Sequence, residues 1–271
     1  MGSKVLFLDI DGTLVDFRGK MPESAGRALE LARERGHKLV LCTGRTRTQL
    51  FSWLLAYGFD GLITGAGAQV EADGKLISRH LMEQKKLERA VDYFERIRAP
   101  YYLQAVNGIY APRWCLECRM EVFRGRITEK EREKQFGTVT RDDRPGKRVD
   151  VEKIAYYQSA EGVEQVREGL GSYFAVEASS YQLINSSDGE VTIRGINKAY
   201  GMQRYLEYAG IAQEDTCAFG DGPNDREMLE FAGIGVAMGN AGEELKGCAD
   251  FVAAPIDQDG LYRAFETLGV L

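Results

Sequence analysis

The chain has 271 residues and a formal net charge of −6 at pH 7. This length allows one or two domains with a substantial core, and the acidic balance excludes a broad basic surface for nucleic-acid binding. No apolar run approaches the roughly 18 residues of a membrane span, and the N-terminus lacks a basic stretch followed by an apolar signal run. We therefore expect a cytoplasmic protein whose partner is a small charged metabolite, not a nucleic acid or a membrane.

The first predicted strand ends in two carboxylates. Residues 5–8 (Val-Leu-Phe-Leu) lead directly into Asp9 and Asp11, which are followed by Gly12 and Thr13. A short apolar run of this kind is typical of a buried parallel strand, and ligands bind beyond the carboxyl ends of such strands. Two acids so close together need a cation or a shared proton. One could attack phosphorus while the other moves a proton. The simpler alternative is a turn, because Asp and Gly are common turn residues.

A second strand is predicted at residues 38–42, after a helix that begins at residues 22–24. Thr43, Gly44 and Arg45 follow this strand directly. The Thr43 hydroxyl and the open backbone N–H groups near Gly44 suit a phosphoryl oxygen.

A third polar cluster follows the predicted strand at residues 216–219. It contains Asp221, Asn224 and Asp225, and Lys198 lies at the start of a helix-like segment before it. Lysine supplies a compact positive charge, and the aspartates supply the hard oxygen ligands that Mg²⁺ prefers. Each predicted strand thus stops at side chains that a phosphate and a metal need.

Each of these residues also has an ordinary structural interpretation. Asn224 and Asp225 could cap the predicted helix at residues 226–231, since both types cap well. Lys198 taken alone could be a solvated helix lysine, and Arg45 could be a surface charge at a helix start.

These segments, in this order, resemble the haloacid dehalogenase (HAD) superfamily. The resemblance is closest to its Cof-type phosphatases, a subfamily IIB-like branch with a large cap between the second and third motifs. It extends to the tail at residues 235–241, 249–250 and 259–260. It implies an α/β fold in which a Rossmann-like, HAD-like parallel-sheet core carries an inserted α+β cap domain.

The resemblance also implies catalytic and metal-binding roles. Asp9 would be the nucleophile that forms an aspartyl-phosphate, and Asp11 the general acid and then the general base. Mg²⁺ would be held by the Asp9 carboxylate, the Asp11 backbone carbonyl and Asp221. Asp225 would support the metal through water or hold Lys198 in place.

The phosphate-binding residues implied by the resemblance are Thr43, Gly44, Lys198 and Asn224. Arg45 would either face the substrate or brace its loop. One position departs from the family pattern, because Ala66 stands where Cof-type sequences often carry Asn. The polar contact that this Asn would make near the substrate is therefore not expected in this chain, whereas the metal site is not affected.

About 150 residues lie between Arg45 and Lys198, whereas only a short loop follows Asp11 before the first predicted helix. We therefore expect the cap to be inserted between Arg45 and Lys198. We expect the catalytic core to comprise residues 1–82 and 188–271, with a hairpin at 68–80, and the cap to comprise residues 83–187. Within the cap we predict helices at 83–98, 128–134 and 161–170, and strands at 101–110, 119–123, 151–158 and 173–184.

Five cysteines are present, which fits reduced thiols in a chain without a signal peptide. Cys42 and Cys217 fall in predicted core strands. Cys115 and Cys118 form a CxxC pair that we interpret as strand or loop thiols. A zinc site would need two further ligands and a redox site a thioredoxin-like context.

Together these features predict a Mg²⁺-dependent phosphatase, as monomer or homodimer, that hydrolyses a small phosphorylated metabolite through an aspartyl-phosphate. A sugar phosphate or a phosphorylated cofactor is the expected substrate. Two alternatives stay open. One is a phosphomutase of the same branch, in which a second hydroxyl rather than water accepts the phosphoryl group. The other is a non-catalytic phospholigand sensor.

Overall fold

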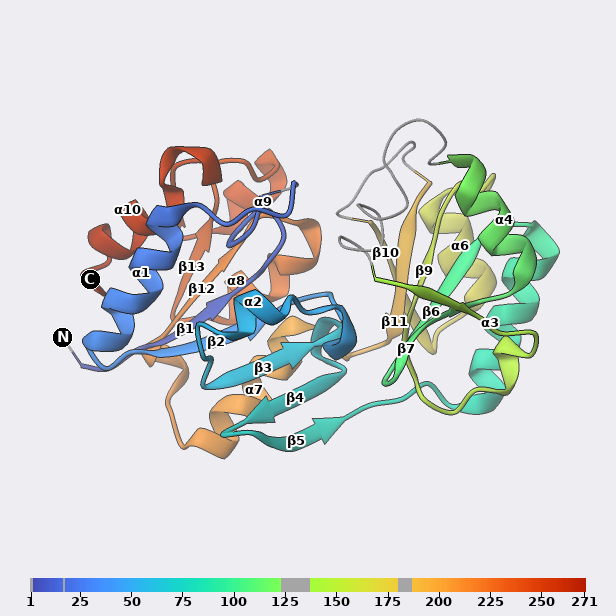
Figure 1. Cartoon of the computed structure of the whole chain (residues 1–271), viewed down its shortest axis with the longest axis horizontal. Coiled ribbons are helices and arrows are strands. Elements are labelled where there is room, and N and C mark those ends of the chain that lie inside the picture. The colour runs from blue at the N-terminus through green and yellow to red at the C-terminus, as the bar shows by residue number, and fades with distance from the viewer. Residues whose placement is uncertain (1, 17, 123–136, 180–186) are drawn as a thin grey trace. The chain divides into compact units, whose positions relative to one another are not determined.

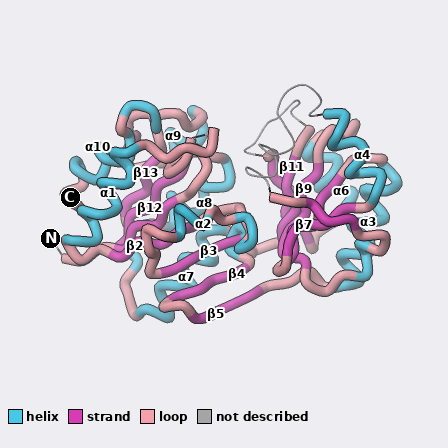
Figure 2. The backbone as a smooth tube through the Cα atoms, in the orientation of Figure 1, coloured by secondary structure: helices cyan, strands magenta, loops and turns pink. Residues whose placement is uncertain are grey.

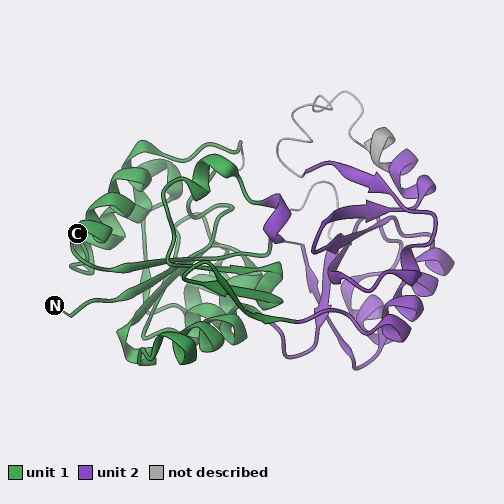
Figure 3. Cartoon of the chain, turned by 60° about the horizontal axis from the view of Figure 1, so that its bottom comes forward, with its two compact units in different colours: residues 1–44, 50–79, 197–271 green, residues 45–49, 80–196 purple. Residues whose placement is uncertain are grey.

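The computed structural model describes all residues except 1, 17, 123–136 and 180–186, and for residues 119–122 it describes the backbone alone. The chain forms two compact units (Figure 3). The first comprises residues 1–44, 50–79 and 197–271, and the second comprises residues 45–49 and 80–196.

An eight-stranded sheet forms the centre of the first unit, in the order β14-β13-β12-β1-β2-β3-β4-β5 (Figure 1). The strands from β14 to β3 run parallel, β4 pairs antiparallel with β3, and β5 pairs antiparallel with β4. The parallel α/β core predicted from the sequence is therefore confirmed, as is the hairpin after residue 68. The strands are β1 (Val5–Leu8), β2 (Lys38–Cys42), β3 (Gly61–Thr64), β4 (Gln69–Ala72), β5 (Lys75–Arg79), β12 (Thr216–Gly220), β13 (Ile234–Ala237) and β14 (Phe251–Val252).

Helices cover both faces of this sheet (Figure 2). Side chains alternate along β1, so Leu6 and Leu8 pack with α1 and α10 while Val5 and Phe7 pack with α7 and α8. A parallel strand buried on both faces needs the continuous apolar run that residues 5–8 supply. The helices are α1 (Glu23–Glu34), α2 (Ser52–Leu55), α7 (Lys198–Ala209), α8 (Arg226–Phe231), α9 (Glu243–Cys248) and α10 (Gly260–Thr267).

The second unit has a six-stranded mixed sheet in the order β10-β11-β9-β6-β7-β8. Helices α3 and α6 pack against one of its faces, where Phe94, Tyr101 and Tyr156 form an aromatic cluster. Its elements are α3 (Gln84–Ile97), β6 (Tyr101–Ala105), β7 (Gly108–Ala111), α4 (Arg113–Val122), β8 (Val139–Arg141), β9 (Val151–Tyr156), α6 (Val163–Leu170), β10 (Phe174–Ala178) and β11 (Gly189–Ile193).

The return of the chain to the first unit differs from the expected position. The sequence predicts that the catalytic core resumes at residue 188. In the structure β11 (Gly189–Ile193) instead pairs antiparallel with β10 and β9 in the second sheet, and the second unit continues to residue 196. Val191 is fully buried there and lies opposite Val176 and Ile154 in the two neighbouring strands. Because these apolar partners are fixed by strand pairing, burial holds β11 in the second unit.

The strand predicted at residues 119–123 is wrong, because residues 113–122 form helix α4. Pro112 precedes the first helical turn and its carbonyl accepts hydrogen bonds from the N–H groups of Cys115 and Leu116. The Leu, Glu, Arg and Met residues that follow favour a helix. Cys115 and Cys118 therefore lie on a helix, not in a strand or loop, and neither forms a disulfide with another cysteine that the structure describes.

Two further predictions extend beyond the described residues. The helix predicted at residues 128–134 lies entirely outside them. The strand predicted at 173–184 is present as β10, and residues 180–184 are not described. Among the helices that the structure does describe, none combines the length and apolar character that crossing a bilayer requires.

Two glycines provide a test of the close packing between the β3–β4 connection and α7. Gly67 and Gly74 both have left-handed backbones, with φ of 95° and 71°. A Cβ on Gly67 would lie 2.0 Å from the carbonyl oxygen of Asn197, whereas one on Gly74 would meet nothing within 4 Å. We expect Gly74→Ala to lower the free energy of unfolding by about 1 kcal/mol and Gly67→Ala by about 3 kcal/mol or more. Urea unfolding of both variants measures this difference, and equal losses would contradict the close approach.

Candidate active site

The polar ends of three neighbouring strands lie at one edge of the first sheet. β1 lies between β12 and β2, and all three run parallel. Asp9, Thr43 and Asp221 directly follow these strands, so they emerge at the same edge. The predicted residues are thus brought together by strand order, although about 180 residues separate Thr43 from Asp221 in the chain.

Lys198 connects two of the carboxylates. Its Nζ donates to Asp9 Oδ1 at 2.7 Å and to Asp225 Oδ1 at 2.5 Å, and only 1% of Lys198 is exposed. Lys198 is the first residue of α7, and the helix begins there because the Asn197 side chain caps it by accepting the N–H of Tyr200. Lys198 is therefore a buried ion-pair partner and not a solvated helix lysine.

Asp225 is fully buried and both of its carboxylate oxygens are engaged. Oδ1 accepts from Lys198, and Oδ2 accepts the backbone N–H groups of Asp221 (3.0 Å) and Gly222 (2.9 Å). Asp225 precedes α8 but makes no side-chain capping bond to it. The capping interpretation thus does not hold for Asp225, whose carboxylate binds the loop before it and the lysine.

Asp221 is held by residues that our sequence analysis gave no role. Thr13 Oγ1 donates to Asp221 Oδ1 at 3.4 Å, and Asn240 Nδ2 donates to Oδ2 at 3.2 Å. The Gly12 backbone lies close against this carboxylate, because a Cβ on residue 12 would be only 2.0 Å from Asp221 Oδ2. Both side chains had a sequence signal, because Thr13 belongs to the first motif and Asn240 to the tail at residues 235–241.

The cluster carries more negative than positive charge. Asp9, Asp221 and Asp225 each place a carboxylate oxygen within 4.8 Å of the others. Burial, together with Asp225 and Asp11, raises the pKa of Asp9 to about 7 despite the opposing effect of Lys198. Burial, Asp9 and Asp225 raise the pKa of Asp221 to about 8. Burial alone would lower the pKa of Lys198, but Asp225 and Asp9 hold it above its usual value.

This donor set fits a divalent cation. Closely spaced carboxylate oxygens are the hard ligands that Mg²⁺ prefers, and a cation would relieve the repulsion that raises the two pKa values. Asp225 is already committed to Lys198 and the loop N–H groups. Asp9 and Asp221 are therefore the better-placed carboxylate ligands.

The other predicted residues occupy different surroundings. Thr43 is buried, its N–H donates to Ile63 and its carbonyl accepts from Ala66. Gly44 and Asn224 are half-buried and follow β2 and β12. Arg45 belongs to the second unit, where its Nη1 donates to the Gln49 carbonyl at 3.3 Å.

Ala66 adopts a left-handed backbone, with φ of 56°. Asn tolerates this conformation better than Ala does. The position therefore has a backbone that suits the Asn expected from the family pattern, even though this chain has Ala there.

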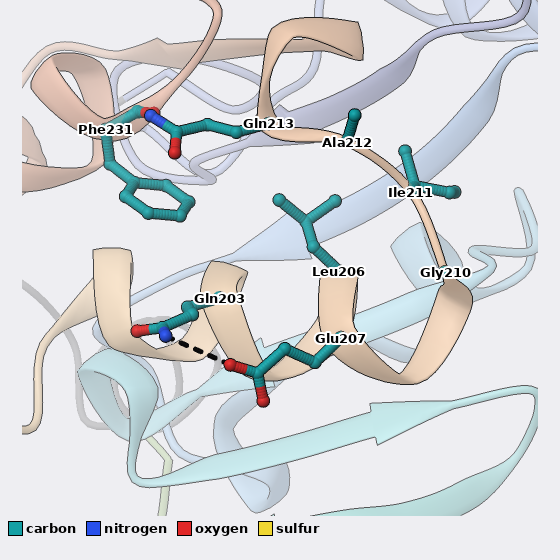
Figure 4. A pocket seen from close by; sticks show the side chains of 8 residues that line it. All are labelled: Gln203, Leu206, Glu207, Gly210, Ile211, Ala212, Gln213 and Phe231. Carbon is teal, nitrogen blue, oxygen red and sulfur yellow. Dashed lines mark hydrogen bonds between the residues drawn. The ribbon is translucent and has the colours of Figure 1, made fainter.

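A pocket of about 590 Å³ lies beside the C-terminal half of α7 (Figure 4). It is lined by three residues of α7, by the segment that follows the helix, and by Phe231: Gln203, Leu206, Glu207, Gly210, Ile211, Ala212, Gln213 and Phe231. Lys198 begins this 12-residue helix, so the two ends of α7 are about 18 Å apart. This pocket is thus separate from the site around Asp9.

A family model described as haloacid dehalogenase-like hydrolase matches residues 6–265. The chain therefore belongs to the haloacid dehalogenase-like hydrolases, as the sequence motifs predicted.

The relatives of the chain within this family include several phosphatases. The 5-amino-6-(5-phospho-D-ribitylamino)uracil phosphatase YcsE of Bacillus subtilis (strain 168) is 28% identical over 267 residues, which cover 96% of this chain and 94% of YcsE. The HAD subclass IIB sugar phosphatase BT4131 matches with a TM-score of 0.82 at 28% identity, over 99% of this chain and 100% of that one. The HAD-superfamily phosphatase BT1666 from Bacteroides thetaiotaomicron matches with a TM-score of 0.83 at 28% identity, over 99% and 96%. The chain is accordingly a phosphatase of this superfamily, a phosphoric monoester hydrolase.

The raised pKa values predict how stability depends on pH in the metal-free protein. Asp9 and Asp221 have ordinary pKa values of 3.8 and native values of about 7 and about 8. At these two groups the native state therefore binds more protons than the unfolded state between about pH 4 and pH 8, and their contribution to the free energy of unfolding should fall as pH rises through this range. The raised pKa of Lys198 acts only at higher pH, because its contribution is fully present below 10.5.

Denaturant unfolding in EDTA at pH 5 and pH 8 measures this dependence. Asp221→Asn should flatten the fall, since it removes one titrating carboxylate and one source of repulsion on Asp9. The same pH dependence in wild type and variant would show that these carboxylates are not its source.

Proposed function

We propose that this phosphatase hydrolyses small phosphorylated metabolites through an aspartyl-phosphate on Asp9, with Mg²⁺ as cofactor. The observation that carries the proposal is the buried Lys198, which bridges Asp9 and Asp225 beside Asp221. A nucleophilic carboxylate must approach a phosphoryl dianion, so positive charge has to be fixed beside it. Lys198 supplies that charge in a place where water cannot screen it.

The reaction has two steps. In the first, a carboxylate oxygen of Asp9 attacks phosphorus, the ester P–O bond breaks, and Asp11 gives a proton to the departing alkoxide. In the second, Asp11 takes a proton from water, the water oxygen attacks phosphorus, and the acyl-phosphate P–O bond breaks. Inorganic phosphate leaves, and both aspartates return to their starting state.

Mg²⁺ would be held by the carboxylates of Asp9 and Asp221 and, as the family resemblance implies, by the backbone carbonyl of Asp11. When bound, the ion would neutralise charge on the phosphoryl oxygens. Asp225 has a supporting role, because it fixes Lys198 with one oxygen and the Asp221–Gly222 backbone with the other.

The transferring phosphoryl group would be bound by Lys198, Thr43, Gly44 and Asn224. For Lys198 the proposal is supported by its ion pairs with Asp9 and Asp225. Thr43 and Gly44 follow β2 and Asn224 lies after β12, and these two strands flank β1, at whose end Asp9 lies. Arg45 is proposed to face the organic part of the substrate, on the resemblance alone.

The relatives support a small substrate. YcsE is a phosphatase of a phosphoribitylamino-uracil, and BT4131 is a sugar phosphatase. We propose for this chain a sugar phosphate or a phosphorylated cofactor or cofactor precursor. The residues that would read the organic part are proposed to lie in the second unit, which would act as the cap.

The nucleophile is tested by Asp9→Asn. Phosphate release from a panel of sugar phosphates, nucleotides and phosphorylated cofactors should need Mg²⁺, stop in EDTA, and fall about 10³-fold or more in the variant, because an amide oxygen is a poor nucleophile. Asp60→Asn is the matched control. Asp60 directly precedes β3, so it lies at the opposite end of the parallel strands from Asp9. Its carboxylate accepts the N–H of Leu39, and an amide oxygen can still accept this bond.

Full activity in Asp9→Asn would remove Asp9 as the nucleophile. Transfer of the phosphoryl group to a second sugar hydroxyl, with no inorganic phosphate released, would instead identify a phosphomutase.

The general acid is tested by comparing two leaving groups in Asp11→Asn. For a sugar phosphate, kcat/KM should fall about 10²–10⁴-fold, because the alkoxide needs a proton. For p-nitrophenyl phosphate the fall should be much smaller, since nitrophenolate leaves unprotonated. A stoichiometric burst of nitrophenolate should also appear, because the variant lacks the base for the second step. Equal losses of kcat/KM for both substrates would contradict the acid role of Asp11.

A further inference from the structure

Asn240 lies two residues beyond Met238, in the loop that follows β13. Gly239 makes its position possible, because a Cβ there would be 2.5 Å from the nitrogen of Pro255. The loop turns back through a hydrogen bond from the Ala241 N–H to the Met238 carbonyl. The Asn240 side chain is exposed, yet it makes hydrogen bonds to three separate segments of the first unit.

The hydrogen bonds fix which way the Asn240 amide points. Its Oδ1 accepts the backbone N–H of Ile256 at 3.0 Å. Its Nδ2 donates to the Gly12 carbonyl at 2.9 Å and to Asp221 Oδ2 at 3.2 Å. Ile256 N–H can only donate and the Gly12 carbonyl can only accept, so the opposite amide orientation would place like groups together.

The Asp221 carboxylate is thereby held on three sides. The Asn240 amide donates to Oδ2, the Thr13 hydroxyl donates to Oδ1, and the Gly12 backbone lies close against the carboxylate. The hydrogen bond from Asn240 to Asp221, at 3.2 Å, is shorter than the one from Thr13, at 3.4 Å. The same NH₂ group also holds the Gly12 carbonyl, so it fixes the Asp221 carboxylate relative to the turn that follows Asp9 and Asp11.

We infer that Asn240 is a positioning residue that orients Asp221 for the divalent cation and so sets the affinity of the site for Mg²⁺. This inference rests on the proposed function. Groups that hydrogen-bond a metal ligand restrict its orientation, and their loss typically costs about 10–100-fold in metal affinity. Without the amide, Asp221 would have to be ordered at the moment of binding.

The alternative is that Asn240 only ties surface loops together through Ile256. Gln213 provides a matched control, because its side-chain amide also donates to a backbone carbonyl, that of Phe231 (2.6 Å), on the exposed surface of the same unit. Figure 4 shows Gln213 and Phe231 among the residues that line the pocket at the C-terminal half of α7. A loss of loop tethering alone would affect both variants alike.

The experiment compares wild type, Asn240→Ala and Gln213→Ala in the whole chain. Two quantities are measured: the rise in Tm with increasing MgCl₂ after EDTA treatment, which reports binding without turnover, and the Mg²⁺ concentration for half-maximal phosphate release. We expect Asn240→Ala to shift both Mg²⁺ curves about 10–100-fold to higher concentration, while Gln213→Ala leaves them unchanged. The Tm in EDTA separates this effect from any change in basal stability.

Unshifted Mg²⁺ curves in Asn240→Ala, with or without a lower Tm in EDTA, would overturn the inference. An equal shift in Gln213→Ala would do the same. Failure of the proposed function is distinguishable, because wild type itself would then show no Mg²⁺-dependent activity.

Discussion

The buried ammonium of Lys198 is the interaction on which the site depends. It lies between Asp9 and Asp225, and these three residues come from the end of β1, the start of α7 and the loop after β12. A buried charge is tolerated only when it is paired and hydrogen-bonded. The pairing therefore joins three segments from distant parts of the chain at one edge of the sheet.

One ammonium does not neutralise the carboxylates around it. Burial and mutual repulsion raise the pKa of Asp9 and Asp221, which means that the folded protein holds these acids at a cost in stability. Perturbed carboxylates of this kind are typical of functional sites. The same excess charge that is unfavourable in the metal-free protein makes the site attractive to a divalent cation, and Asn240 then orients the carboxylate that the cation would use.

Much of the fold could be predicted because its signals are local. The buried strands are short apolar runs, the β4–β5 hairpin turns at Asp73 and Gly74, and α3 has a clear helical period. The errors arose where partners from elsewhere in the chain decide the outcome. Val191 is held in the second sheet by Val176 and Ile154, and α4 follows Pro112 in a segment whose apolar residues also suited a strand.

The sequence by itself determined the chemistry at the strand ends, because the aspartates, Thr43 and Lys198 stand in ordered motifs whose residue types suit a phosphate and a metal. Only the tertiary structure decided how they act on one another. It buries Lys198 between two aspartates, commits Asp225 to loop N–H groups instead of a helix cap, and brings Asn240 to Asp221. The physical reason is that these contacts join residues up to about 190 positions apart, and strand order, which no local pattern encodes, sets their distances.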